Sequence, residues 1–92
     1  MTELRMEVET VQGTQQKMVS QKEAMVNELA TLTGQINQTV GSAWIGGSST
    51  EFQQQYDTLR GQITQQLDAL GQLAQAMQAE IAQWQEMAAR MG

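Results

Sequence analysis

The side chains that could do chemistry in this sequence are mainly carboxylates. Ten Asp and Glu residues could supply a pair for general acid–base catalysis, and Ser, Thr and Tyr hydroxyls could serve as nucleophiles. The carboxylates are scattered along the chain, however, and because it contains no histidine, no hydroxyl has an imidazole beside it to accept its proton. The absence of cysteine also excludes a disulfide framework and a thiolate metal site. We therefore expect no enzyme activity, no metal and no cofactor.

The net charge and the apolar pattern of the sequence exclude some classes of partner and some cellular locations. A formal net charge of −5 would repel a phosphate backbone, so we expect no nucleic acid partner. No run of apolar residues approaches the roughly 20 that cross a bilayer, so we expect no stable membrane insertion. The first ten residues, MTELRMEVET, contain three glutamates and no uninterrupted apolar segment, unlike a cleavable signal peptide. Taken alone, these features indicate a cytosolic protein.

Two long helices are the simplest elements that could position these side chains. The chain has no proline to interrupt a helix, and both halves are rich in good helix formers. Apolar residues recur at spacings of three and four, which predicts helices over about residues 2–40 and 48–90. In the first half these residues are Leu4, Val8, Val11, Met18, Met25, Leu29, Leu32, Ile36 and Val40. In the second half they are Phe52, Tyr56, Leu59, Ile63, Leu70, Leu73, Met77, Trp84, Met87 and Met91.

The midpoint of the sequence predicts a turn over about residues 41–47. Gly46 and Gly47 follow Trp44 closely, and glycine tolerates the left-handed backbone that helix ends and tight turns require. Ser48, followed three residues later by a glutamate, predicts a capping box that starts the second helix. One helix therefore ends and the next begins within a few residues.

So short a connection makes the helices antiparallel neighbours in a single helical-hairpin domain over residues 1–92. Facing residue numbers then add to roughly 90–92. Lys22 falls near Asp68 in this register, which predicts that this lysine of the first seam lies beside a carboxylate. The expected facing pairs are Val40 with Phe52, Ile36 with Tyr56, Leu32 with Leu59, Leu29 with Ile63, Met25 with Leu67, Met18 with Leu73, Val11 with Ile81 and Val8 with Trp84.

Both apolar stripes are wider than a single facing helix requires. The residues that widen them are Val19 and Val26 in the first half and Leu67, Ala74, Ile81 and Ala88 in the second. A lone hairpin buries little apolar surface against the entropy cost of ordering its chain, so we expect two chains to form a four-helix bundle. The predicted hairpin and dimer packing residues are Val19, Val26, Leu29, Leu32, Ile36, Phe52, Tyr56, Leu59, Ile63, Leu70 and Trp84.

The predicted turn also contains a sequence motif. Trp44, Ile45 and Gly46 form a Trp-X-Gly tripeptide between two helical halves, and Phe52 follows the tryptophan by eight residues. With the chain's size and its lack of proline and cysteine, this motif resembles the WXG family of small bacterial proteins of type VII (ESX-type) secretion. The early secreted antigens of mycobacteria belong to that family. The resemblance covers the whole chain.

The resemblance implies a fold, a location and a set of partners. Similar proteins are non-enzymatic hairpins that form antiparallel four-helix dimers, with themselves or with a second WXG-type chain. They leave the bacterial cytoplasm folded and without a cleaved signal peptide, as secreted substrates, partners or adaptors of the export system. In the family, the turn tryptophan lies near a partner's tail, and the two form a signal read by the secretion ATPase. The resemblance therefore assigns recognition to Trp44, Ile45 and Gly46.

One element of the family pattern is missing. The family tail carries a tyrosine followed after three residues by Asp or Glu, but here Tyr56 is followed by Arg60 and Trp84 by Ala88 at that distance. A partner chain could supply the signal, a homodimer could use a different late signal, or the signal could lie beyond this sequence. The choice between homodimer and heterodimer, the host and the role after secretion stay open. The alternative function is an intracellular helical adaptor or export chaperone that binds a partner's amphipathic helix.

Overall fold

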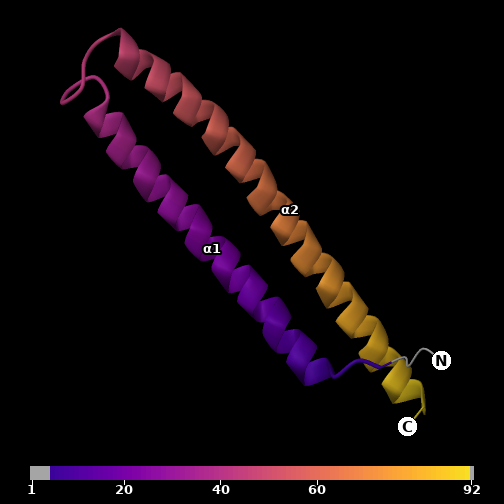
Figure 1. Cartoon of the computed structure of the whole chain (residues 1–92). Helices are drawn as coiled ribbons and strands as arrows, with labels where there is room; N and C mark the ends of the chain where they lie inside the picture. Colours follow the sequence, from indigo (N-terminus) through magenta and orange to yellow (C-terminus); the bar gives the residue numbers. More distant parts are fainter. Residues whose placement is uncertain (1–4, 92) are drawn as a thin grey trace.

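The computed structural model describes residues 5–91 and shows a helical hairpin (Figure 1). Helix α1 (Val8–Thr39) and helix α2 (Gly47–Met91) run antiparallel and are joined by a short turn. The molecule measures 68 × 23 × 18 Å, so it is a rod. The described residues contain no strand, and an isolated bridge pairs Val40 with Trp44 inside the turn. The predicted all-α hairpin is confirmed.

Helix α1 begins later than the apolar pattern predicts. The pattern predicts a helix from about residue 2, whereas residues 5–7 are not helical and residues 2–4 lie outside the described part of the chain. Glu7 occupies the N-cap position with an extended backbone, and its side chain makes no capping hydrogen bond. Because helix ends depend on capping and packing as well as propensity, the good helix formers at 5–7 do not extend α1.

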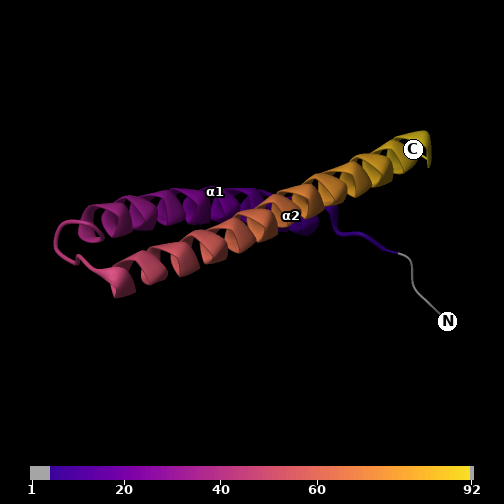
Figure 2. The same cartoon turned by 90° about the horizontal axis from the view of Figure 1, so that it is seen from above.

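Hydrogen bonds between the helices define their register. The hydroxyls of Thr33 and Tyr56 lie 2.7 Å apart, and Gln15 Nε2 donates to the Ala74 carbonyl at 3.3 Å. The facing residue numbers in both contacts add to 89, slightly below the expected range. Because α2 has 45 residues and α1 has 32, the C-terminal end of α2 extends past the start of α1 (Figure 2).

The core of the hairpin is one seam centred on α2. Tyr56, Leu67, Ala74 and Ile81 are at most 7% exposed, whereas no described residue of α1 is buried. The half-buried apolar residues between them are Ile63, Leu70 and Met77, and Trp84 follows Ile81. From Ile63 onward, spacings of four and three alternate along this series, as they do where two helices pack along their length. Leu67, Ala74 and Ile81, expected from the sequence to widen the second stripe, are therefore among its most buried residues.

Lys22 does not form an ion pair with Asp68, because the ion pairs of the described residues do not include this one. The Lys22 side chain instead crosses α2 at Gly71, where an added methyl carbon would lie 2.9 Å from Nζ. The glycine leaves room for the lysine stem, so the ammonium group lies about one helical turn from Asp68 along α2.

Candidate functional site

The charged side chains are dispersed over the surface of the rod. Among residues 5–91, no group of three or more acidic, histidine or cysteine side chains is placed to hold a metal ion. Those residues also form no helix that is both long and apolar enough to cross a membrane. Arg60 lies 3.8 Å from Asp57 and Arg90 lies 2.6 Å from Glu86, and exposed pairs of this kind contribute little stability. The candidate sites are therefore the turn and an apolar face.

Backbone hydrogen bonds hold the turn. The Val40 N–H donates to the Ile36 carbonyl at 2.9 Å, and the Trp44 N–H donates to the Thr39 carbonyl at 3.0 Å. The Gly41 N–H then donates to the Trp44 carbonyl at 2.9 Å. Gly41 has a φ of +94°, which glycine adopts without a steric penalty, so the chain can leave α1 sharply. The result is an ordered loop with Trp44 at the tip of the hairpin.

Gly46 forms the start of α2. Its φ of +141° lies in a region that residues with a Cβ rarely adopt. Its carbonyl accepts hydrogen bonds from Ser49 Oγ at 2.7 Å and from the Thr50 N–H and Oγ1, both at 3.3 Å. The predicted capping box of Ser48 and Glu51 is wrong, because α2 begins one residue earlier than expected and Ser48 already lies inside it. The backbone conformation at the start of α2 therefore explains why the Trp-X-Gly motif has a glycine at this position.

The tip carries an exposed aromatic pair. The ring centroids of Trp44 and Phe52 are 5.2 Å apart, and the rings are tilted by 48°. Both residues are 38% exposed, and Ile45 between the tip and α2 is 77% exposed. Trp44 and Phe52 also line a hollow with Leu32 and Val40. Trp44 therefore lies over the end of the hairpin with part of its surface exposed to solvent.

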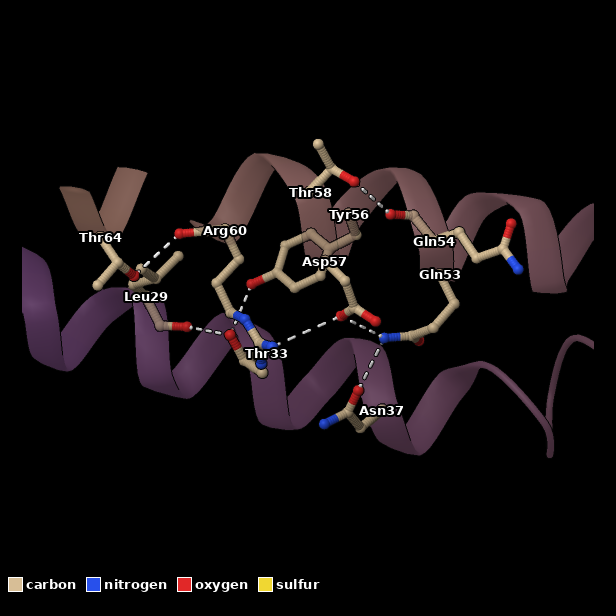
Figure 3. A network of polar contacts seen from close by, with 10 residues as sticks. All are labelled: Leu29, Thr33, Asn37, Gln53, Gln54, Tyr56, Asp57, Thr58, Arg60 and Thr64. Atoms are coloured by element: carbon tan, nitrogen blue, oxygen red, sulfur yellow. Dashed lines mark hydrogen bonds and ion pairs between the residues drawn. The ribbon is translucent and has the colours of Figure 1, made fainter. Parts of the chain in front are cut away.

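One long face of the hairpin carries a polar network (Figure 3). Beside the Thr33–Tyr56 contact, Gln53 Nε2 donates to Asn37 Oδ1 and to Asp57 Oδ1, each at 3.1 Å. Every buried side-chain nitrogen or oxygen in the described residues has a hydrogen-bond partner. Side chains from both helices therefore satisfy one another on this face, which we call the polar face.

The other long face is an apolar groove that runs along the rod. It is lined by side chains at every seventh position of each helix, and we call this surface the apolar groove. Its α1 residues are Val11, Met18, Met25 and Leu32. Its α2 residues are Phe52, Leu59, Gln66 and Leu73. Leu59 is 51% exposed and Leu73 is 59% exposed, so the hollows along this face leave apolar side chains open to solvent.

The predicted packing residues divide between the seam and the outer faces. Tyr56 is buried, and the half-buried members are Leu29, Ile36, Ile63, Leu70 and Trp84. The exposed members are Val19, Val26, Leu32, Phe52 and Leu59. Val26 lies in a separate hollow with Lys22 and Glu23, outside the apolar groove.

Sequence reasoning left five groove residues out of the predicted packing set. These are Val11, Met18, Met25, Gln66 and Leu73, and their seven-residue steps from Leu32 and Leu59 are the signal that could have included them.

The chain was compared with models of known protein families. A family model described as "WXG100: Proteins of 100 residues with WXG" matches residues 3–81. This range includes the turn, all of α1 and most of α2. No curated protein and no solved structure matches the chain.

Proposed function

The chain belongs to the WXG100 family, and we propose that it is a non-enzymatic protein that a bacterial type VII secretion system exports as a folded dimer. WXG100 proteins are small helical proteins secreted by these systems. In this proposal, the protein is a secreted substrate, partner or adaptor of the system. It pairs with a WXG-type chain, either a second copy of itself or a different member.

The exposed aromatic tip is the observation that supports this proposal most directly. A secretion ATPase that recognises folded cargo requires a feature that is both ordered and accessible. Trp44 is held by backbone hydrogen bonds and by the ring of Phe52, and it is still 38% exposed. Gly46 fixes the angle at which α2 leaves the tip. The recognition role that we propose for Trp44, Ile45 and Gly46 therefore has a rigid geometric basis.

We place the partner chain on the apolar groove. Burying the exposed half of a leucine side chain contributes about 1 kcal/mol, and the groove offers several such side chains in a row. Helical partners recognise grooves of this kind through apolar residues at successive turns. Leu32, Leu59 and Leu73 are between 46% and 59% exposed in the single hairpin, so they have surface available for this contact.

A charge placed at the tip tests the export role. Trp44→Arg should remove the protein from the medium of a host that carries the secretion system, whereas the purified variant should keep its helical circular dichroism. The helicity should persist because Trp44 lies outside the helices and outside the buried seam. Gln54→Arg adds the same charge at an exposed position of α2 and should be secreted normally. Normal secretion of Trp44→Arg would contradict a role for the tip.

The apolar groove also favours a second candidate function. It is open along the rod and could hold the amphipathic helix of another protein, as an intracellular adaptor or export chaperone would. The location of the wild-type protein separates the two candidates. Retention inside cells with an active secretion system would support the adaptor, and appearance in the medium without cell lysis would support export.

A further inference from the structure

Methionine side chains line the apolar groove away from the tip. Met6 and Met77 lie in a hollow near the open end of the hairpin, Met18 lies in the next hollow, and Met25 lies at mid-length. The hollow at the tip is lined instead by aliphatic, aromatic, threonine and glutamine side chains. Because the chain has no cysteine, thioethers are the sulfur groups that an oxidant meets in this protein. Within the groove, chemistry at sulfur is therefore restricted to the part beyond the tip.

Met25 is the most accessible of these four methionines. It is 39% exposed, whereas Met6, Met18 and Met77 are half-buried. A peroxide must reach the sulfur atom to oxidise it, so exposure decides which thioether reacts first. In a hairpin whose groove is uncovered, Met25 should therefore be the first groove methionine to react.

The hollow around Met25 contains groups that suit both a thioether and its oxidised form. Leu59 supplies an apolar wall, and the side chains of Gln62, Gln65 and Gln66 line the same hollow. Each amide carries two N–H donors, and within residues 5–91 these three side chains have no hydrogen-bond partner that would occupy them. A thioether is a weak acceptor, whereas a sulfoxide oxygen is polar and accepts such donors well. The reduced side chain therefore fits the apolar wall, and the oxidised one fits the amides.

We propose that Met25 is a reversible oxidation site and that its sulfoxide weakens the binding of an apolar partner to the groove. In the forward step, hydrogen peroxide transfers one oxygen atom to the Met25 sulfur, which loses two electrons, while the O–O bond breaks and water leaves. In the reverse step, a sulfoxide reductase uses two thiols to remove that oxygen as water, and the thiols become a disulfide. This inference rests on the proposed function, which places the partner chain on the groove.

The oxidised groove loses affinity because a partner would have to strip water and the glutamine amides from the sulfoxide oxygen while offering an apolar surface in return. The fold of the single hairpin should persist, since its most buried residues, Ala74 and Ile81, lie in the seam rather than around Met25. A partner that already covers the groove would shield the Met25 sulfur. Oxidation therefore acts on unpaired chains and withdraws them from pairing.

Mass spectrometry of the full chain after timed exposure to hydrogen peroxide tests the reactivity. In dilute solution, where chains are unpaired, Met25 should be converted before Met18 and Met77. Met87 and Met91 are 50% and 85% exposed near the end of α2, so they should react at least as fast and serve as internal references. Conversion of Met25 no faster than that of Met77 overturns the proposed site.

Sedimentation before and after oxidation tests the effect on pairing, with treatment stopped once Met25 is converted and Met18 is not. The oxidised wild type should bind its partner, whether a second copy or another WXG-type chain, about tenfold more weakly. Met25→Leu should keep its affinity after the same treatment, whereas Met87→Leu, the same change outside the groove hollows, should lose affinity as the wild type does. Reduction by methionine sulfoxide reductase should restore the wild-type affinity. An oxidised wild type that pairs normally, or an equal loss in Met25→Leu, overturns the inference.

The outcomes separate this inference from the proposed function. A protein that is secreted, and that pairs normally with Met25 oxidised, overturns the oxidation site and leaves the proposed function standing. A protein that is retained inside cells, but that loses pairing on oxidation of Met25, overturns export and supports the oxidation site. A chain whose untreated form pairs neither with itself nor with another WXG-type chain overturns the groove as a partner surface, and the oxidation site with it.

Discussion

The two long faces of the hairpin are built from the same two helices, but one carries paired polar groups and the other carries exposed apolar side chains. On the polar face, Gln53 links Asn37 to Asp57, so polar groups of both helices are satisfied within one molecule. On the apolar groove, Leu32 and Leu59 remain about half exposed. The polar groups of the first face are therefore satisfied within one molecule, whereas the second face leaves apolar surface exposed to water.

Single-residue steps decide which face a side chain joins. Leu32 lines the groove, whereas its neighbour Thr33 hydrogen-bonds to Tyr56. Phe52 likewise lines the groove, whereas the next residue, Gln53, belongs to the polar face. Because each residue advances about 100° around a helix, adjacent positions on either side of the seam point to opposite faces. The contrast between the faces is therefore encoded in the order of polar and apolar residues.

The largest expected effect comes from a charge in the apolar groove. Leu59→Asp should weaken pairing about 100-fold or more, since each partner would then bury an unpaired carboxylate. The single hairpin should keep its helicity, because Leu59 is already 51% exposed in it. Analytical ultracentrifugation measures the first effect and circular dichroism the second. Thr58→Asp adds a charge at the preceding, exposed position, and a comparable loss of pairing there would contradict the difference between the two faces.

A smaller loss of stability is expected when the contact between Thr33 and Tyr56 is removed, where the polar network meets the buried seam. Tyr56→Phe removes the 2.7 Å contact to Thr33 and should lower the free energy of unfolding by about 1 kcal/mol without changing the pairing Kd. Chemical denaturation and sedimentation measure the two quantities. A double variant with Thr33→Val should lose less than the sum of the two single losses, because both remove the same contact. Full additivity would show that the contact contributes nothing.

Two glycines of α2 differ in their surroundings and can be compared directly: Gly61 has open space beside it, whereas the Lys22 side chain lies against Gly71. Gly61→Ala should stabilise the hairpin by about 0.5–1 kcal/mol, because alanine favours a helix and nothing lies within 4 Å of the added methyl group. Gly71→Ala should gain less, since its methyl group would displace the Lys22 side chain. Melting temperatures of the two variants test this order, and an equal gain would show that Lys22 moves aside freely.

The smallest change in stability is expected from the exposed ion pair between Asp57 and Arg60 on the polar face. Asp57→Asn removes the charge that faces Arg60 but keeps an acceptor for Gln53, so the free energy of unfolding should change by less than about 0.5 kcal/mol. Thermal melts at low and high salt should agree for this variant. A loss above about 1 kcal/mol would mean that this ion pair contributes more than exposed pairs usually do.

The sequence predicted the hairpin well but left the rotation of α2 undetermined. The turn around Trp44, the two helices and a register within a few residues follow from glycine placement and apolar spacing. Spacing could not decide which apolar column of α2 faces α1, because Leu59 and Leu73 form one seven-residue series and Leu67 and Ala74 form another. In the structure, Leu67 and Ala74 pack in the seam, whereas Leu59 and Leu73 lie on the apolar groove.

Local contacts account for the other differences. Gly46 offers its own carbonyl to the first turn of α2, so no capping box is needed at Ser48. The direction of the long Lys22 side chain depends on the bare backbone of Gly71, a position 49 residues away in the chain. Such tertiary details cannot be read from local patterns, because they depend on how closely the two helices approach.

The shape of the rod has a consequence for transport. An object that enters a channel end-on needs an aperture set by its width, and a single hairpin presents only 23 × 18 Å in that direction despite its 68 Å length. A second copy stacked on the groove would thicken the short dimension and leave the length nearly unchanged. Under the proposed folded export, the conduit therefore needs to admit two slender rods abreast, and cargo orientation at its mouth decides whether they pass.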